Sequence, residues 1–212
     1  ETAPKFVGSL RNGIMEETVC RIVREDSLER LFPMLEGFGR VWVVCDRNVW
    51  ETVGAKICGG LRGADMGTEA DSVARGSLLG VSIIDATEEN KTFSTVETIV
   101  GEMLEKGADR NVLVMGVGGG ITTDIAGFAA SIYKRGVRFA FVPTTLLAQV
   151  DAAIGGKNGV NFHSYKNMLG VIRQPEFTYI YNGPLKKLSR ESFLSGVAEL
   201  LKTFIISDAS SY

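Results

Sequence analysis

Histidine is almost absent from this chain: His163 is the single histidine among 212 residues. A metal site that needs two or three histidines therefore cannot be built from one copy of the sequence. A Ser/His/Asp triad would have to use His163, which lies in the polar, turn-like stretch 161–167 without a nucleophile motif nearby. We expect His163 to be a solvated loop residue, so neither kind of site is expected from the chain alone.

Cysteine and proline are also scarce. The three cysteines, Cys20, Cys45 and Cys58, are odd in number and lack the spacing of a metal site, which indicates reduced thiols of a cytoplasmic protein. Five prolines against 25 glycines indicate many tight turns and no proline-rich linker.

Long apolar runs and an excess of one charge are missing as well. No run approaches the roughly 20 residues of a membrane span, and the N-terminus does not have the form of a signal peptide. A net charge of -2 offers no basic surface, so we expect neither nucleic acid nor a membrane as a partner. With 45% hydrophobic residues, the composition is that of a soluble globular protein with a full-sized core.

Glycine is abundant, and its densest cluster follows an apolar run. Residues 112–115 lead into glycines at positions 116, 118, 119 and 120, and apolar residues spaced three or four apart begin at Ile121. A strand, a glycine turn and a helix in this order are typical of a site where a phosphate meets the free N–H groups of a helix N-terminus. Glycine would permit positive φ in the turn and would let the phosphate approach the backbone.

This cluster matches neither of two well-known phosphate fingerprints. The pattern G-x-G-x-x-G needs a third glycine where Ile121 stands, and a P-loop at Gly156-Lys157 needs glycine at Asp151 and Ser or Thr at Asn158. A tight turn without a ligand is the alternative interpretation. Because three consecutive glycines exceed what a turn requires, we favour an anion site.

Segments of strand and helix length alternate along the chain. Strands are expected at 41–45, 81–84, 112–115 and 137–142, after one or two edge strands within 5–24; helices are expected at 27–35, 49–61, 93–104, 121–132, 144–150 and 189–206. Residues 62–80 are expected to form a surface excursion, and 151–173 an ordered functional loop, because their helical periodicity is poor. Alternating strands and helices with short connections predict an α/β fold with a parallel sheet.

Polar clusters follow three of the expected strands. They are Asp46–Asn48, Glu88–Lys91 and the glycine cluster. Parallel α/β sheets bind ligands at the carboxyl ends of their strands; an acidic residue suits ribose hydroxyls and a lysine suits a pyrophosphate. These clusters predict a nucleotide site from the residues alone. Glu199 and Lys202 share one face of the last helix, where spacing alone favours an ordinary surface salt bridge.

Several longer stretches, taken together, resemble the 3-dehydroquinate synthase family. The matching text is GGGITTDIAGFAASIYKRG, VPTTLLAQVDAAIGGKNGVN, YKNMLG, QPEF and GVAELLK. The resemblance is dense from about residue 115 to 202 and looser but collinear from residue 41 onward. It implies a Rossmann-like NAD-binding domain at 1–182, followed at 183–212 by the start of a helical metal and substrate domain.

The resemblance also implies a role for each matching position. NAD would be bound by Asp46, Asn48, Glu88, Lys91, Gly119, Gly120, Ile121, Asp124, Thr144, Thr145, Leu147 and Lys166. The substrate would be held by Asp151, Lys157, Asn167 and Lys202, and Arg135 would reach the substrate phosphate of a neighbouring subunit. Glu199 would be a ligand of a catalytic divalent metal, zinc or cobalt, which replaces the salt-bridge interpretation.

The implied reaction begins with a seven-carbon keto-acid sugar phosphate of the shikimate pathway. Bound NAD+ would oxidise a ring hydroxyl to a ketone, which acidifies the neighbouring C–H so that phosphate is eliminated. NADH would then return the hydride, and ring opening with an intramolecular aldol step would close the carbocycle. A homodimer is the expected assembly.

The chain departs from the family in length and at two motif positions. Family members are longer, and their helical C-terminal domain supplies two histidine metal ligands, so we expect this chain to be an N-terminal fragment that cannot turn over substrate. Thr87 stands where the family usually has Gly, and Asn158 where Thr often follows Gly-Gly-Lys; both suggest a lineage variant.

Three alternatives stay open. Another sugar phosphate cyclase, such as a 2-epi-5-epi-valiolone synthase, would share the cofactor chemistry, although Lys157, Asn167 and Lys202 favour dehydroquinate synthase. A metal-dependent polyol or glycerol dehydrogenase would share the architecture, although the stretch AQVDAAIGGKNGVN speaks against it. The third alternative is a chain that acts only as an NAD-binding and dimerising module.

Overall fold

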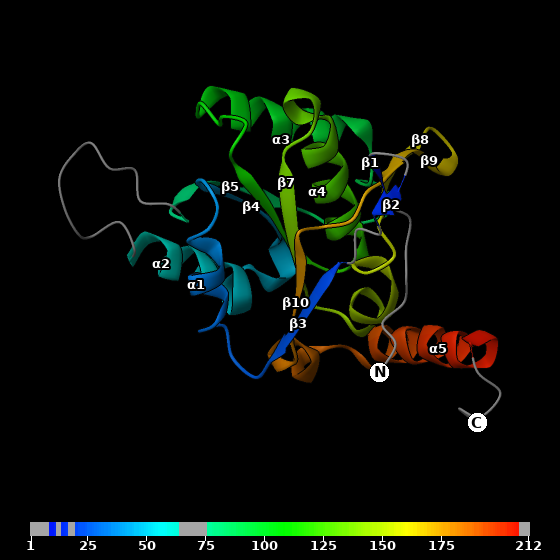
Figure 1. Cartoon of the computed structure of the whole chain (residues 1–212). Helices are drawn as coiled ribbons and strands as arrows, with labels where there is room; N and C mark the ends of the chain where they lie inside the picture. The colour runs from blue at the N-terminus through cyan, green and yellow to red at the C-terminus, as the bar shows by residue number, and fades with distance from the viewer. Residues whose placement is uncertain (1–8, 12–13, 17–19, 64–75, 208–212) are drawn as a thin grey trace.

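The computed structural model describes residues 9–11, 14–16, 20–63 and 76–207, and it describes side chains at 20–62 and 76–206. Its centre is a six-stranded parallel sheet with the strand order β3–β10–β7–β6–β4–β5 (Figure 1). The strands are β3 (Arg21–Glu25), β4 (Val41–Asp46), β5 (Leu78–Ile84), β6 (Leu113–Gly118), β7 (Arg138–Pro143) and β10 (Phe177–Tyr181). The predicted parallel α/β fold is confirmed, and β3 is an edge strand as expected.

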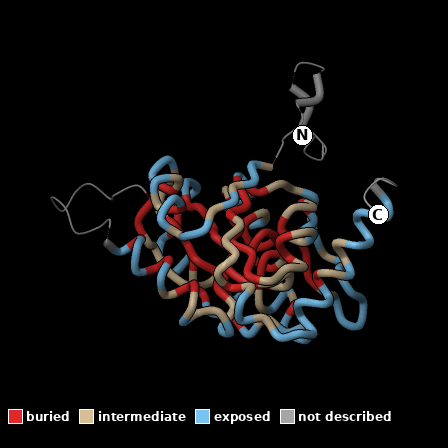
Figure 2. Tube along the Cα trace, turned by 90° about the horizontal axis from the view of Figure 1, so that it is seen from below, coloured by how far each residue is buried: buried red, intermediate tan, exposed pale blue. Residues whose placement is uncertain are grey.

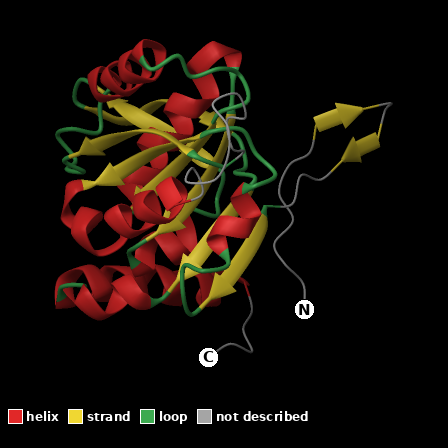
Figure 3. Ribbon diagram, turned by 90° about the vertical axis from the view of Figure 1, so that its left-hand side faces the viewer, coloured by secondary structure: helices red, strands yellow, loops and turns green. Residues whose placement is uncertain are grey.

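Helices on both faces of the sheet connect its strands (Figure 3). The π-helical turn Trp50–Gly54 and α2 (Ala55–Gly63) lead from β4 to β5, α3 (Phe93–Glu105) leads from β5 to β6, and α4 (Gly120–Ile132) leads from β6 to β7. α1 (Leu31–Leu35) and α2 pack on one face, and α3 and α4 pack against each other on the opposite face. These crossovers return the chain to the same end of the sheet, which is why neighbouring strands are parallel.

Each face of the sheet buries its own apolar layer, because successive strand residues point to opposite sides. In β4, Val41, Val43 and Cys45 belong to the layer beneath α1 and α2, whereas Trp42 and Val44 belong to the layer beneath α3 and α4. All of these are at most 2% exposed. The buried residues fill the middle of the molecule in Figure 2. Burial on both faces explains the continuous apolar run in the sequence.

The stretch 151–173, which we expected to be a loop, contains a β-hairpin instead. β8 (Lys157–Phe162) and β9 (Tyr165–Ile172) pair antiparallel, and β8 packs on α4. Glycines hid the strands: Gly159 and Gly170 face each other, and a Cβ on Gly159 would lie 2.5 Å from the Leu169 carbonyl oxygen. The close approach of the two backbones therefore requires glycine, and the loop prediction was wrong.

Some element boundaries also differ from expectation. The helix predicted from Ser27 begins at Leu31, and β5 begins at Leu78 rather than at residue 81. α5 (Arg190–Ser207) starts as predicted, because Ser189 Oγ accepts a hydrogen bond from Ser192 N (3.1 Å). A short antiparallel pair, β1 (Ser9–Arg11) and β2 (Ile14–Glu16), precedes the sheet. Much of the excursion predicted at 62–80 lies outside the described residues.

The three cysteines are free thiols, as expected. Burial raises the pKa of Cys45 to about 12 and that of Cys58 to about 11, so both stay protonated and act as apolar core residues. Within the part of the chain that the structure describes, every helix is too short or too polar to cross a membrane.

Candidate functional site

The chain changes direction across the sheet between β4 and β6. From β4 it moves outward to β5, and from β6 it moves the opposite way to β7 and β10. The carboxyl ends of β4, β5 and β6 are therefore neighbours at a switch point, where α/β sheets commonly bind ligands. Asp46 ends β4, Gly118 ends β6, and the loop with Glu88 and Lys91 follows β5. The three predicted polar clusters thus share one edge of the sheet.

The glycine turn joins β6 to α4 without any residue at positive φ. Glycines with positive φ are found at positions 76, 107, 136 and 156, so the expectation of positive φ in this turn was wrong. Space is the reason for glycine here: a Cβ on Gly116 would lie 2.9 Å from Ala126 Cβ, and one on Gly118 would lie 2.4 Å from Thr122 Oγ1. Glycine lets α4 pack closely on β6, with Gly119 at the N-cap of the helix.

The groups around this turn fit an anionic ligand. Gly119 and Gly120 are partly exposed, and Cβ atoms there would lie 3.2 Å from Thr145 Cγ2 and from Ala152 Cβ, so side chains would fill the space before α4. The Thr144 hydroxyl is buried and has no hydrogen-bond partner among the described residues. A buried, unpaired hydroxyl is costly unless a partner arrives. The residues present therefore suit the pyrophosphate of a dinucleotide.

Lys91 joins three separate parts of the chain beside the glycine turn. Its ammonium donates to Asp124 Oδ2 on α4 (2.5 Å) and to Asn167 Oδ1 on β9 (2.6 Å). The Lys91 side chain is 7% exposed and that of Asp124 is 18% exposed. Lys166 Nζ, from the same hairpin, lies 3.4 Å from Glu88 Oε1. The fold thus brings these predicted cofactor residues together with Asn167, a predicted substrate residue.

Burial changes the acidity of Asp124. Burial raises the pKa of the Asp124 carboxyl to about 6. The hydrogen bond and the charge of Lys91 lower this pKa, whereas the negative charges of Asp151 and Glu88 raise it further. A carboxylate that is this poorly hydrated depends on Lys91 for its stability at neutral pH.

The raised pKa of Asp124 predicts a pH-dependent stability. Because this pKa is about 6 in the folded chain and 3.8 in the unfolded chain, the folded state holds the proton more tightly. The contribution of Asp124 to stability is therefore complete below pH 4 and is lost as the pH rises through about 6. In urea titrations from pH 4 to 8, the free energy of unfolding should fall less with pH for Asp124→Asn than for the wild type, by on the order of 1–3 kcal/mol. Parallel pH profiles would contradict this account.

Asp46 is held in a small turn at the end of β4. Its Oδ1 accepts hydrogen bonds from Asn48 N (3.0 Å) and from Asn48 Nδ2 (3.1 Å). Burial raises the pKa of Asp46, and these hydrogen bonds oppose the rise. Next to it, Arg47 Nε lies 2.5 Å from Asp85 Oδ1 and so links this turn to the loop after β5. Asp46 and Asn48 therefore form one unit at the edge of the crevice.

The segment after β7 borders the glycine turn from the other side. Thr145 Oγ1 accepts a hydrogen bond from Ala148 N (3.2 Å), and its methyl group faces Gly119. Asp151 lies in the π-helical turn Ala148–Ala152, a conformation that is frequent at functional sites. The charge of Asp151 raises the pKa of Asp124 on α4 and that of Lys202 on α5. Asp151 therefore lies within electrostatic range of both helices.

α5 meets this segment at Gly196. A Cβ there would lie 2.6 Å from Leu146 Cβ and 2.7 Å from Leu147 N, so only glycine allows the contact. Further along the helix, Glu199 and Lys202 form an ion pair, as their spacing predicted. Among the residues that the structure describes, no cluster of three His, Cys, Asp or Glu side chains could hold a metal ion. Of the metal ligands that the resemblance implies, one glutamate and two histidines, the described residues contain only Glu199. They therefore do not fit a complete metal site.

Lys157 and Arg135 have no hydrogen bond or ion pair with the Lys91 network in the described part of the chain. Lys157 is exposed at the start of β8. Arg135 is exposed at the opposite end of α4 from the glycine turn, where Lys134 has φ 47° and Arg135 has φ 71°. Positive φ in non-glycine residues costs roughly 1 kcal/mol or more each. This turn is therefore a strained projection on the side of the molecule away from the crevice.

Sequence reasoning missed Asn161, which contacts two of the predicted residues. Asn161 Nδ2 donates to Glu88 Oε1 (3.0 Å), and Asn161 Oδ1 accepts from Asn167 N (2.8 Å). Its spacing in the sequence is not distinctive, and its importance follows from the hairpin, which we had predicted to be a loop. His163, as expected, is exposed, and it lies in the turn of this hairpin at φ 53°.

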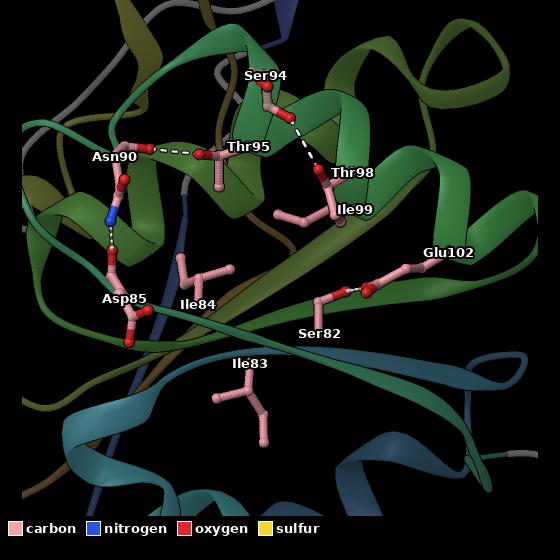
Figure 4. Close-up of a pocket in the computed structure, with 10 residues that line it drawn as sticks. All are labelled: Ser82, Ile83, Ile84, Asp85, Asn90, Ser94, Thr95, Thr98, Ile99 and Glu102. Carbon is pink, nitrogen blue, oxygen red and sulfur yellow. Dashed lines mark hydrogen bonds between the residues drawn. The ribbon is translucent and has the colours of Figure 1, made fainter.

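A separate hollow of about 250 Å³ lies between edge strand β5 and α3 (Figure 4). Its polar groups mostly bind one another: Ser82 donates to Glu102, and Asn90 Nδ2 donates to the Asp85 carbonyl oxygen (3.0 Å). Trp42 Nε1 donates to Ser82 Oγ (3.0 Å) and so links the hollow to the core. Since its hydrogen bonds are largely satisfied, it is a weaker candidate for a site than the crevice at the switch point.

The parallel sheet, its two helical layers and the polar crevice at the switch point define a Rossmann-like α/β domain. The family model described as 3-dehydroquinate synthase N-terminal matches residues 81–195. The chain belongs to the 3-dehydroquinate synthase family.

Curated relatives carry the same family name. A 3-dehydroquinate synthase from Blochmanniella pennsylvanica is 48% identical over 130 residues, which cover 61% of this chain and 36% of that protein. One from Alkaliphilus metalliredigens is 38% identical over 176 residues, which cover 83% of this chain and 46% of that protein. The chain therefore spans less than half the length of these relatives.

Solved structures of sugar phosphate cyclases share the fold. ValA, the 2-epi-5-epi-valiolone synthase of Streptomyces hygroscopicus subsp. jinggangensis 5008 with NAD+ and Zn2+ bound, is 32% identical with a TM-score of 0.77, over 92% of this chain and 51% of that one. A 2-deoxy-scyllo-inosose synthase complexed with carbaglucose-6-phosphate, NAD+ and Co2+ is 26% identical with a TM-score of 0.76, over 90% of this chain and 52% of that one. A probable glycerol dehydrogenase from Sinorhizobium meliloti 1021, at 18% identity and a TM-score of 0.64, shares the fold alone.

Proposed function

We propose that this chain is the NAD-binding part of a 3-dehydroquinate synthase. Such an enzyme eliminates phosphate from 3-deoxy-D-arabino-heptulosonate 7-phosphate and forms 3-dehydroquinate. The observation that carries the proposal is the Lys91 network, in which one buried ammonium joins Asp124, beside the glycine turn, to Asn167 on the hairpin. Family membership and the NAD+ bound to ValA support it.

In this proposal the dinucleotide lies along the carboxyl edge of the sheet. NAD, when bound, supplies a reversible hydride acceptor. Asp46, Asn48 and Glu88 hydrogen-bond the ribose hydroxyls, and the backbone N–H groups at Gly119, Gly120 and Ile121 face the pyrophosphate. Lys91, held by Asp124, offsets the phosphate charge, and Lys166 adds a second cation. Thr144, Thr145 and Leu147 border the nicotinamide end.

The substrate lies between this edge and α5. Lys157, Asn167 and Lys202 hold its carboxylate, hydroxyl and phosphate groups, and Asp151 accepts a hydrogen bond from a substrate hydroxyl. The hydrogen bond from Lys202 to Glu199 raises the pKa of Lys202, so this group stays cationic at neutral pH. Lysines that face the leaving phosphate stabilise the charge that develops there.

The metal and the assembly belong to the same proposal. Glu199 is one ligand of a divalent metal, and further ligands come from outside residues 1–212. Residues 1–182 form the NAD-binding domain, and 183–212 begin the domain that completes the site. Arg135, on its strained turn away from the crevice, acts on the substrate phosphate of a second copy in a cytoplasmic homodimer. Light scattering tests the dimer, and a monomeric mass at micromolar concentration would overturn this part.

Titration with NAD tests the proposal directly. Trp50 lies four residues after Asp46 and is partly exposed, so its fluorescence provides a signal. We expect saturable binding with a Kd in the micromolar range, about -8 kcal/mol. We also expect no steady-state phosphate release from residues 1–212 with added zinc, because Glu199 is the only proposed metal ligand in the chain. A chain that does not bind NAD would contradict the proposal, and full turnover would contradict the assignment of the remaining metal ligands.

A second candidate is a 2-epi-5-epi-valiolone synthase-like cyclase, which the 32% identity to ValA over 92% of this chain favours. Phosphate release from a heptulose phosphate without a carboxylate, measured on the chain together with the domain that completes its metal site, would support it. A polyol dehydrogenase would give a lasting NADH absorbance, whereas a cyclase regenerates NAD+. A protein that binds NAD but turns over no substrate even together with the domain that completes the site would be a binding and dimerising module.

A further inference from the structure

The side chain of Asn161 spans the gap between the loop after β5 and the β8–β9 hairpin. Its Nδ2 donates to Glu88 Oε1 (3.0 Å) and to the Glu88 carbonyl oxygen (3.3 Å), and its Oδ1 accepts from Asn167 N (2.8 Å). Its own backbone N donates to the Lys91 carbonyl oxygen (2.8 Å). The amide nitrogen of Asn161 thus links β8 to the loop after β5, and its amide oxygen links β8 to β9 within the hairpin.

These contacts determine where two other side chains point. Asn167 has φ 54°, a left-handed conformation that asparagine adopts more often than most residues. The hydrogen bond from Asn167 N to Asn161 Oδ1 fixes this conformation, and Asn167 Oδ1 accepts a hydrogen bond from Lys91 Nζ at 2.6 Å. On the other side, the bond from Asn161 Nδ2 goes to Oε1 of Glu88, and Oε2 accepts no hydrogen bond from the residues that the structure describes, so it can accept one from a ligand.

We propose that Asn161 is a positioning residue for the dinucleotide site, which aims the Glu88 carboxylate at the ribose and ties it to Asn167 on the substrate side. The inference rests on the proposed function. The hydrogen bond from Asn161 is the main reason that the pKa of Glu88 is lowered, so the carboxylate remains an acceptor. The charged groups that also act on Glu88 are Lys166 and Lys91, and Glu88 in turn acts on Glu89 and Asp124.

The isosteric substitution Asn161→Asp separates the two links. It keeps an oxygen for Asn167 N, but it replaces the donor to Glu88 with a second carboxylate. We expect the Kd for NAD at pH 8 to rise about ten-fold or more, as for a lost hydrogen bond to a charged group. As the pH falls to 5, the ratio of the variant Kd to the wild-type Kd should return towards one, because one proton shared by the two carboxyls restores the hydrogen bond.

Asn111→Asp is the matched control, because it introduces the same charge at an exposed position just before β6, at the opposite end of the sheet from the crevice. Its Kd for NAD should stay within about two-fold of the wild type at every pH. In a Glu88→Gln background, Asn161→Asp should cost little further affinity, since the repulsion between carboxylates is gone. This double variant also keeps the test usable if Asn161→Asp alone unfolds.

The outcomes distinguish this inference from the proposed function. If the wild type does not bind NAD, the proposed function fails, and the role of Asn161 fails with it. If the wild type binds NAD and Asn161→Asp binds equally well at pH 8, the Asn161 inference alone is overturned. A loss that is the same at pH 5 and pH 8, or that adds fully to the Glu88→Gln loss, would also overturn it, because a purely structural defect behaves in that way.

Discussion

Replacing Lys91 with methionine should abolish measurable NAD binding and lower the free energy of unfolding by about 3 kcal/mol at pH 8. Methionine keeps much of the side-chain volume but removes the ammonium that lies 2.5 Å from Asp124 Oδ2. The Asp124 carboxylate, 18% exposed, would then be buried without a cation. Urea unfolding and the NAD titration measure the two effects. At pH 5 the loss of stability should be smaller, because Asp124 is then largely protonated.

Lys166→Met is the control for this experiment. Lys166 belongs to the same site and lies 3.4 Å from Glu88 Oε1, but its side chain is 71% exposed. Water already screens this pair, so the free energy of unfolding should change by no more than about 0.5 kcal/mol. If the two lysine variants lost equal stability, burial would not be the reason for the effect at Lys91.

Replacing Gly127 with alanine should destabilise the chain by about 2–3 kcal/mol. Gly127 lies in α4, and a Cβ there would be 2.0 Å from Asn158 Oδ1 and 3.0 Å from Phe141 Cζ. Asn158 cannot move aside freely, because its Nδ2 donates to the carbonyl oxygens of Gly156 (3.0 Å) and Arg173 (2.9 Å). Thermal and urea unfolding report the loss.

Gly101→Ala, in a second helix, should have the opposite effect on stability. Gly101 lies within α3, and a Cβ there would have no neighbouring atom within 4 Å. Alanine is favoured over glycine in a helix interior, so the variant should be more stable by roughly 0.5–1 kcal/mol. A gain in stability for Gly127→Ala, or a loss for Gly101→Ala, would show that the space around these helices has been misjudged.

The sequence was sufficient to predict β4, β6 and β7 because these strands are buried on both faces, whereas β10 (Phe177–Tyr181) was not predicted. A continuous apolar run such as 41–45 is typical of a central parallel strand. Because parallel strands all point the same way, their carboxyl ends lie at the same edge of the sheet. Asp46, Glu88 and Lys91 could therefore be assigned to one crevice. The hairpin at 157–172 was missed, because Gly159 and Gly170 break the alternation of side chains that marks a strand.

The detailed contacts within the crevice could not be predicted in the same way. The bond from Lys91 to Asn167 joins residues 76 positions apart, and local spacing carries no information about such a pair. Asn161 depends on the register of the hairpin, which the sequence alone did not reveal. The glycine turn was predicted at the right place, between β6 and α4, but the expected positive φ was wrong: close packing of α4 on β6 requires glycine at positions 116 and 118.

The position of β3 has a consequence for the biosynthesis of this chain. β3 is the first strand of the main sheet in sequence, and its neighbour there is β10, with Arg21 beside Phe177. A ribosome must therefore release nearly the whole sheet before β3 can pair. Until then the backbone groups of β3 remain open to other chains, so β3 is the strand of the nascent sheet that is most exposed to misassembly.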